Sequence, residues 1–141
     1  MTTLNYTFAI IKPDAFNSGK AGKILAHLES QGFVLRAARV IHLSRRQAEE
    51  FYAVHRGRPF YEELVSFMSS AQCMPMILQK ENAVLGLRDA IGATDPAEAA
   101  AGTVRKLFAE SKGKNAIHAS DSDENAAREA RFFFAECDWA R

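Results

Sequence analysis

Short strand-like runs alternate with amphipathic helical patterns along the whole chain, and this alternation limits the possible folds most strongly. β-branched and aromatic residues over Tyr6–Ile11 predict a strand. The next segment, Lys20–Gln31, has apolar residues at helical spacing and is followed by Gly32, which predicts an amphipathic helix with a glycine stop. A second strand is expected over Phe33–Leu43, where apolar residues alternate with arginines.

The remaining chain continues this alternation. Strands are expected over Cys73–Gln79 and Ala116–Ala119, and Pro75 predicts that the former lies at a sheet edge or carries a bulge. Helices are expected over Ser44–Ala53 (which opens with a capping-box pattern), after Pro59, over Ala83–Ile91, over Asp95–Glu98, after Thr103 and over Ser122–Glu136. Without the extra helices the order is β-α-β-β-α-β. This order predicts a ferredoxin-like fold of the α/β (α+β) class, with a four-stranded antiparallel sheet, helices packed on one face and additional short helices.

Composition limits the class of protein. The chain has 141 residues, of which 48% are hydrophobic, so we expect residues 1–141 to form a single domain with its own core. The net charge of +1 argues against nucleic acid as the main ligand and against a membrane surface. No apolar run approaches the roughly 20 residues that span a bilayer. Cys73 and Cys137 belong to no Cys/His cluster, which excludes a disulfide framework or a structural zinc site. These features predict a cytoplasmic protein.

One segment looks like a phosphate-binding loop but fails the motif. Asn17 stands where a P-loop needs glycine, and Ile24 stands where serine or threonine must hold magnesium. A flexible turn leading into a helix is the better interpretation.

One of the four histidines has a candidate partner. His118 lies in Asn115–Asp121, a short strand-like segment between two polar turns. Glu129 falls about two turns into the following helix, and a helix packed back on the sheet would bring its carboxylate to the imidazole. Such a contact fixes the tautomer and leaves the other ring nitrogen as an acceptor or nucleophile. A structural histidine at a strand end explains this segment equally well.

Cationic and aromatic side chains supply further candidates. Arginine forks, ammonium groups and hydroxyls suit phosphate oxygens. The candidates of this kind are Lys12, Arg88, Thr94 and Arg105. Tyr52 and Phe60 flank a basic loop, and an exposed ring there could stack on a nucleobase. Taken singly, each charge is better explained by solvation and each ring by core packing.

Together these residues resemble one family, the nucleoside diphosphate kinases, from Tyr6 to the last expected helix. The most specific segment is Asn115–Asp121, which is similar to the family's signature around its phosphorylated histidine. Other motifs agree in order and spacing: Ile11–Asp14, Arg58–Tyr61, Gly92–Pro96 and Gly102–Arg105.

The resemblance implies an enzyme with a ping-pong mechanism. The γ-phosphate of a nucleoside triphosphate, ATP as donor, would pass to a nucleoside diphosphate through a phosphohistidine on His118, which maintains NTP and dNTP pools. Mg²⁺ would arrive on the nucleotide phosphates, with no ligand from protein side chains. The resemblance also implies a homo-oligomer, a hexamer or a tetramer built from dimers.

The resemblance assigns roles to particular residues. Glu129 orients His118, Ser120 is hydrogen-bonded nearby, and Lys12 and Tyr52 lie beside the transferring group. The residues implied to bind the nucleotide are Lys12, Phe60, Leu64, Arg88, Thr94, Arg105 and Asn115. Phe60 stacks on the base, and stacking without edge contacts predicts tolerance among bases.

Several positions depart from the family pattern. They are Ala71-Gln72, Ala101, Lys112 and Ala119. Ala119 replaces the glycine that usually follows the histidine, and a positive φ there would cost alanine about 1–2 kcal/mol.

Two other functions stay open from sequence. One is a non-catalytic ferredoxin-like module that binds nucleotide or protein, against which the retained His118 argues. The other is a phosphohistidine carrier or protein-histidine kinase in signalling, which would use the same histidine.

Overall fold

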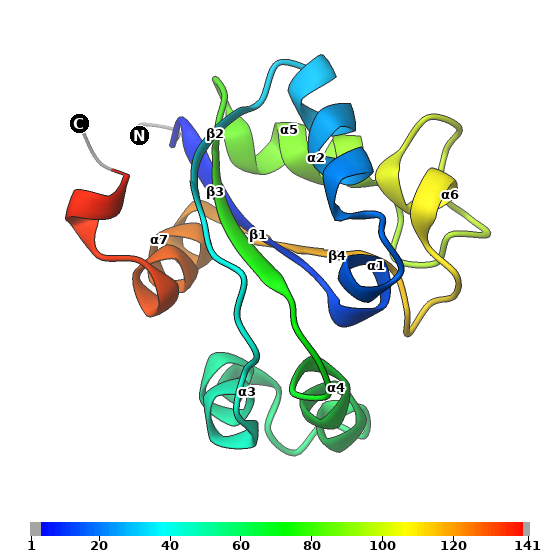
Figure 1. Ribbon diagram of the computed structural model, residues 1–141, viewed down its shortest axis with the longest axis vertical. Coiled ribbons are helices and arrows are strands. Elements are labelled where there is room, and N and C mark those ends of the chain that lie inside the picture. The colour runs from blue at the N-terminus through cyan, green and yellow to red at the C-terminus, as the bar shows by residue number, and fades with distance from the viewer. Residues whose placement is uncertain (1–3, 140–141) are drawn as a thin grey trace.

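A four-stranded antiparallel sheet forms the centre of the protein (Figure 1). The computed structural model describes residues 4–139. The strands are β1 (Tyr6–Ile11), β2 (Val34–Ala38), β3 (Met74–Gln79) and β4 (Ile117–Ala119). They lie in the order β2-β3-β1-β4, and every neighbouring pair is antiparallel. This order confirms the ferredoxin-like plan.

Helices fill the connections between the strands. They are α1 (Pro13–Asn17), α2 (Ala21–Ser30), α3 (Arg45–Phe51), α4 (Tyr61–Met68), α5 (Ala83–Ile91), α6 (Val104–Phe108) and α7 (Asp123–Phe133), with 3₁₀ turns η1 (Ala53–His55) and η2 (Glu136–Asp138). α3 and α4 lie side by side beyond one end of the sheet (Figure 1).

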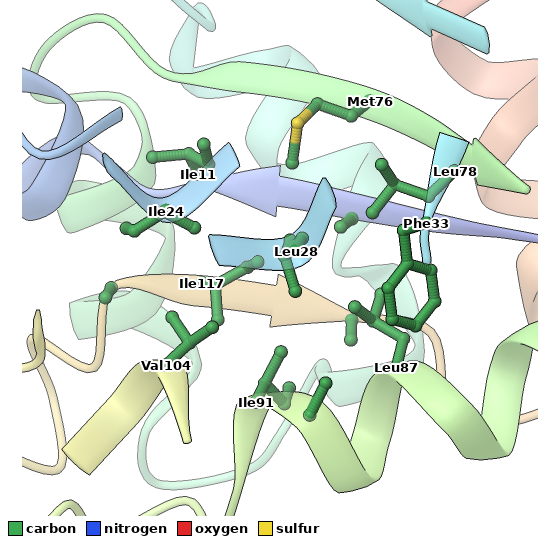
Figure 2. Packing of buried hydrophobic residues seen from close by; sticks show 14 of the residues in the cluster. Ile11, Ile24, Leu28, Phe33, Met76, Leu78, Leu87, Ile91, Val104 and Ile117 are labelled. Atoms are coloured by element: carbon green, nitrogen blue, oxygen red, sulfur yellow. The ribbon is translucent and has the colours of Figure 1, made fainter. Parts of the chain in front are cut away.

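Both faces of the sheet carry a core, because successive side chains of a strand point to opposite faces. Ala9 and Ile11 of β1 face a cluster formed with α2, α5 and α6 (Figure 2). Phe8 and Ile10 face a second cluster formed with α3, α4 and α7. Helices were expected on one face of the sheet, but they cover both faces. The additional helices build a second core, and this second face holds Tyr52 and His118.

Pro75 lies in an interior strand, so the prediction that it marks a sheet edge is wrong. β3 pairs with β1 on one side and with β2 on the other. The Pro75 carbonyl accepts a hydrogen bond from Arg39 N–H at 3.1 Å, just beyond the end of β2. The missing N–H of proline therefore faces a stretch where regular pairing has already ended. The register shift in this pair lies on β2, between Leu35 and Ala37.

Other boundaries differ for local reasons. β2 is shorter than the predicted Phe33–Leu43, and past its end an isolated bridge joins Ile41 to Cys73. Asp95–Glu98 forms a turn instead of a helix. Asp95 Oδ1 accepts from Ala97 N–H at 2.9 Å, as a helix cap would, but the chain does not continue as a helix.

Replacement of Gly92 by alanine should destabilise the fold. Gly92 follows α5 with φ 87°, and an added Cβ would lie 2.6 Å from Thr103 Oγ1. Gly92→Ala therefore combines backbone strain with a steric clash against the residue that caps α6. We expect the free energy of unfolding to fall by about 3 kcal/mol, measured by urea denaturation.

Gly19→Ala is the matched control. Gly19 also has a positive φ, 78°, but nothing lies within 4 Å of an added Cβ. The expected loss is about 1 kcal/mol from strain alone. Equal losses in the two variants would contradict the role of the Thr103 contact.

Candidate active site

His118 faces the second core because of its place in β4. Its neighbours Ile117 and Ala119 point into the cluster with α2 and α5, so the alternating His118 side chain lies on the opposite face. Its side chain is 19% exposed. The rings of Phe51 and Tyr52 lie edge-on at centroid distances of 5.5 and 5.9 Å. The imidazole is thus held between strand and aromatic rings, with one side open to solvent.

Glu129 of α7 holds the imidazole. Its Oε1 lies 2.7 Å from His118 Nε2 and also accepts the Ser120 hydroxyl at 2.7 Å. Glu129 is buried, and Arg128 lies 3.4 Å from its other oxygen. A carboxylate at Nε2 selects the tautomer protonated at Nε2, which leaves the Nδ1 lone pair available. The three predicted residues therefore form one hydrogen-bonded group.

Tyr52 adds a buried hydroxyl beside this group. The hydroxyl has no hydrogen-bond partner among residues 4–139. Burial, and then the charge of Glu129, raises the pKa of this phenol, so it stays protonated. An unpaired buried donor is costly unless a ligand or water uses it. This cost makes the hydroxyl a candidate contact for an anionic ligand.

Lys12 is buried at the end of β1, where Asn115 receives its ammonium group. Lys12 Nζ donates to Asn115 Oδ1 at 2.8 Å, and Asn115 Nδ2 donates to the Thr94 carbonyl at 3.3 Å. Burial, and then the positive charge of Arg105, lowers the pKa of Lys12 to about 8. A bound anion would raise this pKa again. These three predicted residues also meet in space.

Two arginines complete a cationic region around β4. Buried Arg105 of α6 donates to the carbonyls of Ile117 at 2.8 Å and Gly92 at 3.1 Å. Its Nε has no hydrogen-bond partner in the described part of the chain. Burial, and then repulsion from Arg88, lowers the pKa of Arg105 to about 10. Arg88 in turn donates to the Ala119 carbonyl at 3.5 Å. Mutual repulsion between these cations favours binding of an anion.

Phe60 and Leu64 lie at α4, beyond Tyr52. Phe60 is 47% exposed, and its ring lies 5.2 Å from that of His55. The His55 ring is in turn stacked near Tyr52 at 6.3 Å. Leu64 is half-buried against the second core. An exposed ring on a loop next to a cationic site can stack on a planar group. Sequence reasoning assigned His55 no role here.

Backbone strain falls on Ala116, not on Ala119. Ala119 is a regular member of β4 paired with Ala9, whereas Ala116 has φ 74°. Ala119 has no positive φ, so the cost that a positive φ would impose on alanine there does not arise. The Ala116 N–H donates to Asp14 Oδ2 at 3.0 Å. Asp14 belongs to the Ile11–Asp14 motif, but the sequence alone did not predict a role for it.

The described residues hold no group of three or more His, Cys, Asp or Glu side chains that could bind a metal ion. A membrane-spanning helix is also missing from residues 4–139, where every helix is too short or too polar to cross a bilayer.

The geometry combines an available imidazole nitrogen with three cationic side chains. Nδ1 of His118 can act as a nucleophile, since Nε2 is engaged by Glu129. Lys12, Arg88 and Arg105 would neutralise a multiply charged anion near it. This arrangement suits the transfer of an anionic group to and from the histidine.

The charge of Lys12 should lower the stability of the fold at neutral pH. The shift of the Lys12 pKa from 10.5 to about 8 corresponds to about 3 kcal/mol against the protonated form. The folded pKa is below the unfolded one, so the cost is complete below pH 8 and disappears as the pH rises to 10.5. The stability advantage of Lys12→Met over wild type should therefore shrink between pH 8 and 10.5, measured by urea unfolding.

Lys106→Met is the control. Lys106 is exposed on α6, so the free energy of unfolding of this variant should change with pH in parallel with that of the wild type. A Lys12→Met curve that also runs parallel to wild type would contradict the lowered pKa.

Comparisons with known proteins show the family of the chain. A sequence model of the family Nucleoside diphosphate kinase matches residues 5–139. A nucleoside diphosphate kinase of Chlorobium chlorochromatii is 61% identical over 92% of each chain, and one of Sorangium cellulosum is 54% identical over 94% of this chain and 92% of the relative. The solved structure of the Aquifex aeolicus nucleoside diphosphate kinase superposes with a TM-score of 0.94 at 43% identity, covering 96% of this chain and 99% of that one. The chain belongs to the nucleoside diphosphate kinase family.

Proposed function

We propose that the chain transfers the γ-phosphate of a nucleoside triphosphate, with ATP as donor, to a nucleoside diphosphate through a phosphohistidine on His118. Phosphotransfer between nucleoside phosphates follows from family membership. The ping-pong route through His118 is our proposal. One observation carries it: Glu129 engages Nε2 at 2.7 Å, while the side chain keeps 19% exposure for attack through Nδ1.

The reaction would occur in two matched half-reactions. Nδ1 attacks the γ-phosphorus, the bond to the β-phosphate oxygen breaks, and the diphosphate leaves. Glu129 stabilises the positive charge that forms on the imidazole. The β-phosphate oxygen of a second diphosphate then attacks the phosphohistidine and releases the histidine. Because one phosphoanhydride is exchanged for another, the two half-reactions are nearly balanced, and positioning with charge neutralisation supplies most of the catalysis.

The proposed phosphate contacts follow the cationic region. Lys12 and the Tyr52 hydroxyl would lie beside the transferring phosphoryl group. Ser120 would help to position His118 through its hydrogen bond to Glu129. Arg88, Thr94 and Arg105 would bind the phosphates, and Asn115 would bind the ribose together with Lys12. Burial lowers the pKa of Lys12 and Arg105, so phosphate binding would recover part of the desolvation cost.

We propose that the base lies against Phe60, with Leu64 beside it. Phe60 offers an exposed ring. Stacking uses the π-face that every base has, so the site should accept several bases.

We propose that Mg²⁺ reaches the site on the nucleotide phosphates. Residues 4–139 contain no carboxylate cluster that would form a dedicated cage. Mg²⁺ commonly binds through substrate phosphates and keeps several waters, and there it would neutralise phosphate charge.

We propose that the protein is a homo-oligomer built from dimers, a tetramer or a hexamer. β2 is an edge strand, and Val34 on it is 54% exposed. Pairing between copies would cover such an edge. A single domain over residues 1–141 and a cytoplasmic location are also part of the proposal, the latter supported by the free thiols of Cys73 and Cys137.

His118→Ala should abolish formation of the phosphoenzyme. Intact-protein mass is measured after brief incubation with ATP and Mg²⁺, followed by a chase with GDP. The wild type should gain one acid-labile phosphoryl group, and GDP should remove it to give GTP. Because the variant lacks the nucleophile, it should gain none and should keep most of its nucleotide affinity.

His42→Ala is the matched control, since His42 bonds to the Ser69 carbonyl on a different part of the surface. It should behave as wild type. A wild-type phosphoryl group that GDP cannot remove would favour a signalling carrier. Turnover by His118→Ala would overturn the covalent mechanism.

Phe60→Ala should weaken the binding of all nucleoside diphosphates to a similar degree. Loss of stacking costs about 1–3 kcal/mol per base, so KM should rise about fivefold or more for ADP, GDP and CDP alike. Steady-state kinetics checks this, with Val54→Ala as control because Val54 is an exposed apolar residue of the same loop. A loss confined to one base would indicate hydrogen-bonded recognition of its edge.

A further inference from the structure

The turn that leads into β4 is strained. Ala116 has φ 74°, in the left-handed region that non-glycine residues avoid. The Ile117 N–H donates to the Asn115 carbonyl at 2.9 Å, which closes a three-residue turn around Ala116. Asn115 is the first residue of this turn, and His118 directly follows it. Their positions therefore depend on whether Ala116 keeps this conformation.

The backbone N–H and C=O of Ala116 both form hydrogen bonds with residues that directly follow β1. The Ala116 carbonyl accepts a hydrogen bond from Lys12 N–H at 2.9 Å. The Ala116 N–H donates to Oδ2 of Asp14, in the first turn of α1, at 3.0 Å. The Lys12 contact belongs to the backbone and survives substitution. The Asp14 contact depends on one side chain, which lies 102 positions away in sequence.

The carboxylate of Asp14 is poorly compensated. Its Oδ1 is buried and has no hydrogen-bond partner among residues 4–139. A buried carboxylate oxygen without a partner lowers stability, and an asparagine could accept the Ala116 N–H equally well. The hydrogen bond to Ala116 therefore does not explain why this residue is a charged aspartate. The neighbouring Lys12 explains the charge, because the negative charge of Asp14 raises the pKa of Lys12 against the effect of burial.

We propose that Asp14 is a positioning residue for phosphoryl transfer, because its carboxylate holds Ala116 in the left-handed turn that sets Asn115 and His118. This inference rests on the proposed function of His118. Asp14 need not touch the substrate. It acts through the backbone of Ala116, and its charge acts on the neighbouring Lys12.

A purely structural role for Asp14 makes a different prediction. An acidic residue in the first turn of a helix interacts favourably with the helix dipole. If Asp14 served α1 alone, its loss would lower stability without changing the environment of His118. A glycine at position 116 would then restore nothing.

The test compares Asp14→Ala, Ala116→Gly, the double variant and Asp14→Asn. Glycine adopts φ near +74° without strain, so it should keep the turn when the carboxylate is absent. Asp123→Ala is the matched control, because Asp123 Oδ2 also accepts a hydrogen bond from a distant backbone N–H, that of Leu4, at 3.3 Å. Two quantities are measured: the rate of phosphoenzyme formation at saturating ATP, and the ¹H–¹⁵N signals of the His118 imidazole without nucleotide.

Asp14→Ala should lower the phosphorylation rate by about tenfold or more and shift the His118 signals, because small displacements of a reacting group cost large factors in rate. Ala116→Gly alone should stay near wild type. The double variant should recover most of the rate and the wild-type signals. Asp14→Asn keeps the acceptor, so it should keep the signals. Asp123→Ala should change neither quantity.

Two results would overturn the inference: unchanged rate and signals in a folded Asp14→Ala, or a folded double variant with shifted signals and no recovery. If Asp14→Ala does not fold, the double variant and Asp14→Asn decide. Shifted signals in both would count against the inference, and wild-type signals in both would support it. Failure of the wild type to form a phosphoenzyme would refute the proposed function instead. In that case the imidazole signals still decide the role of Asp14, since they need no reaction.

Discussion

The hydrogen bond between Glu129 and His118 is the contact on which the proposed chemistry of this protein depends. It joins α7 to β4 across the second core, and it requires a buried carboxylate next to an imidazole on the same face of the sheet. The Ser120 hydroxyl donates a second hydrogen bond to the same carboxylate oxygen and holds the carboxylate in place. Without this contact the imidazole could adopt either tautomer, and Nδ1 would lose its constant role as acceptor.

The cationic side chains around this contact lower the stability of the ligand-free protein. Lys12 and Arg105 are both buried, and burial lowers the pKa of each. Their backbone and amide acceptors compensate part of this desolvation, and a polyanionic ligand would compensate more. The ligand-free site thus carries a cost in stability, which binding of the proposed phosphate ligands would offset in part.

The sequence predicted the fold where a local signal and the tertiary context agree. Strand and helix periodicity located β1, α5 and α7, and Ser44 and Gln47 form the capping box that the pattern indicated. The predictions failed where neighbours decide. Pro75 is accommodated in an interior strand because β2 ends opposite it, and Asp95–Glu98 forms a turn although Asp95 makes the contact of a helix cap.

By itself, the sequence determined the order of elements, the residue types available for chemistry and the similarity to one family. These properties are local, so they can be read from spacing and composition. Only the tertiary structure decided which of those residues meet. Asp14 and Ala116 are 102 positions apart, and their contact exists because β1 pairs with β4. The strain therefore falls on Ala116 instead of Ala119, since backbone dihedrals follow from long-range packing that no local pattern encodes.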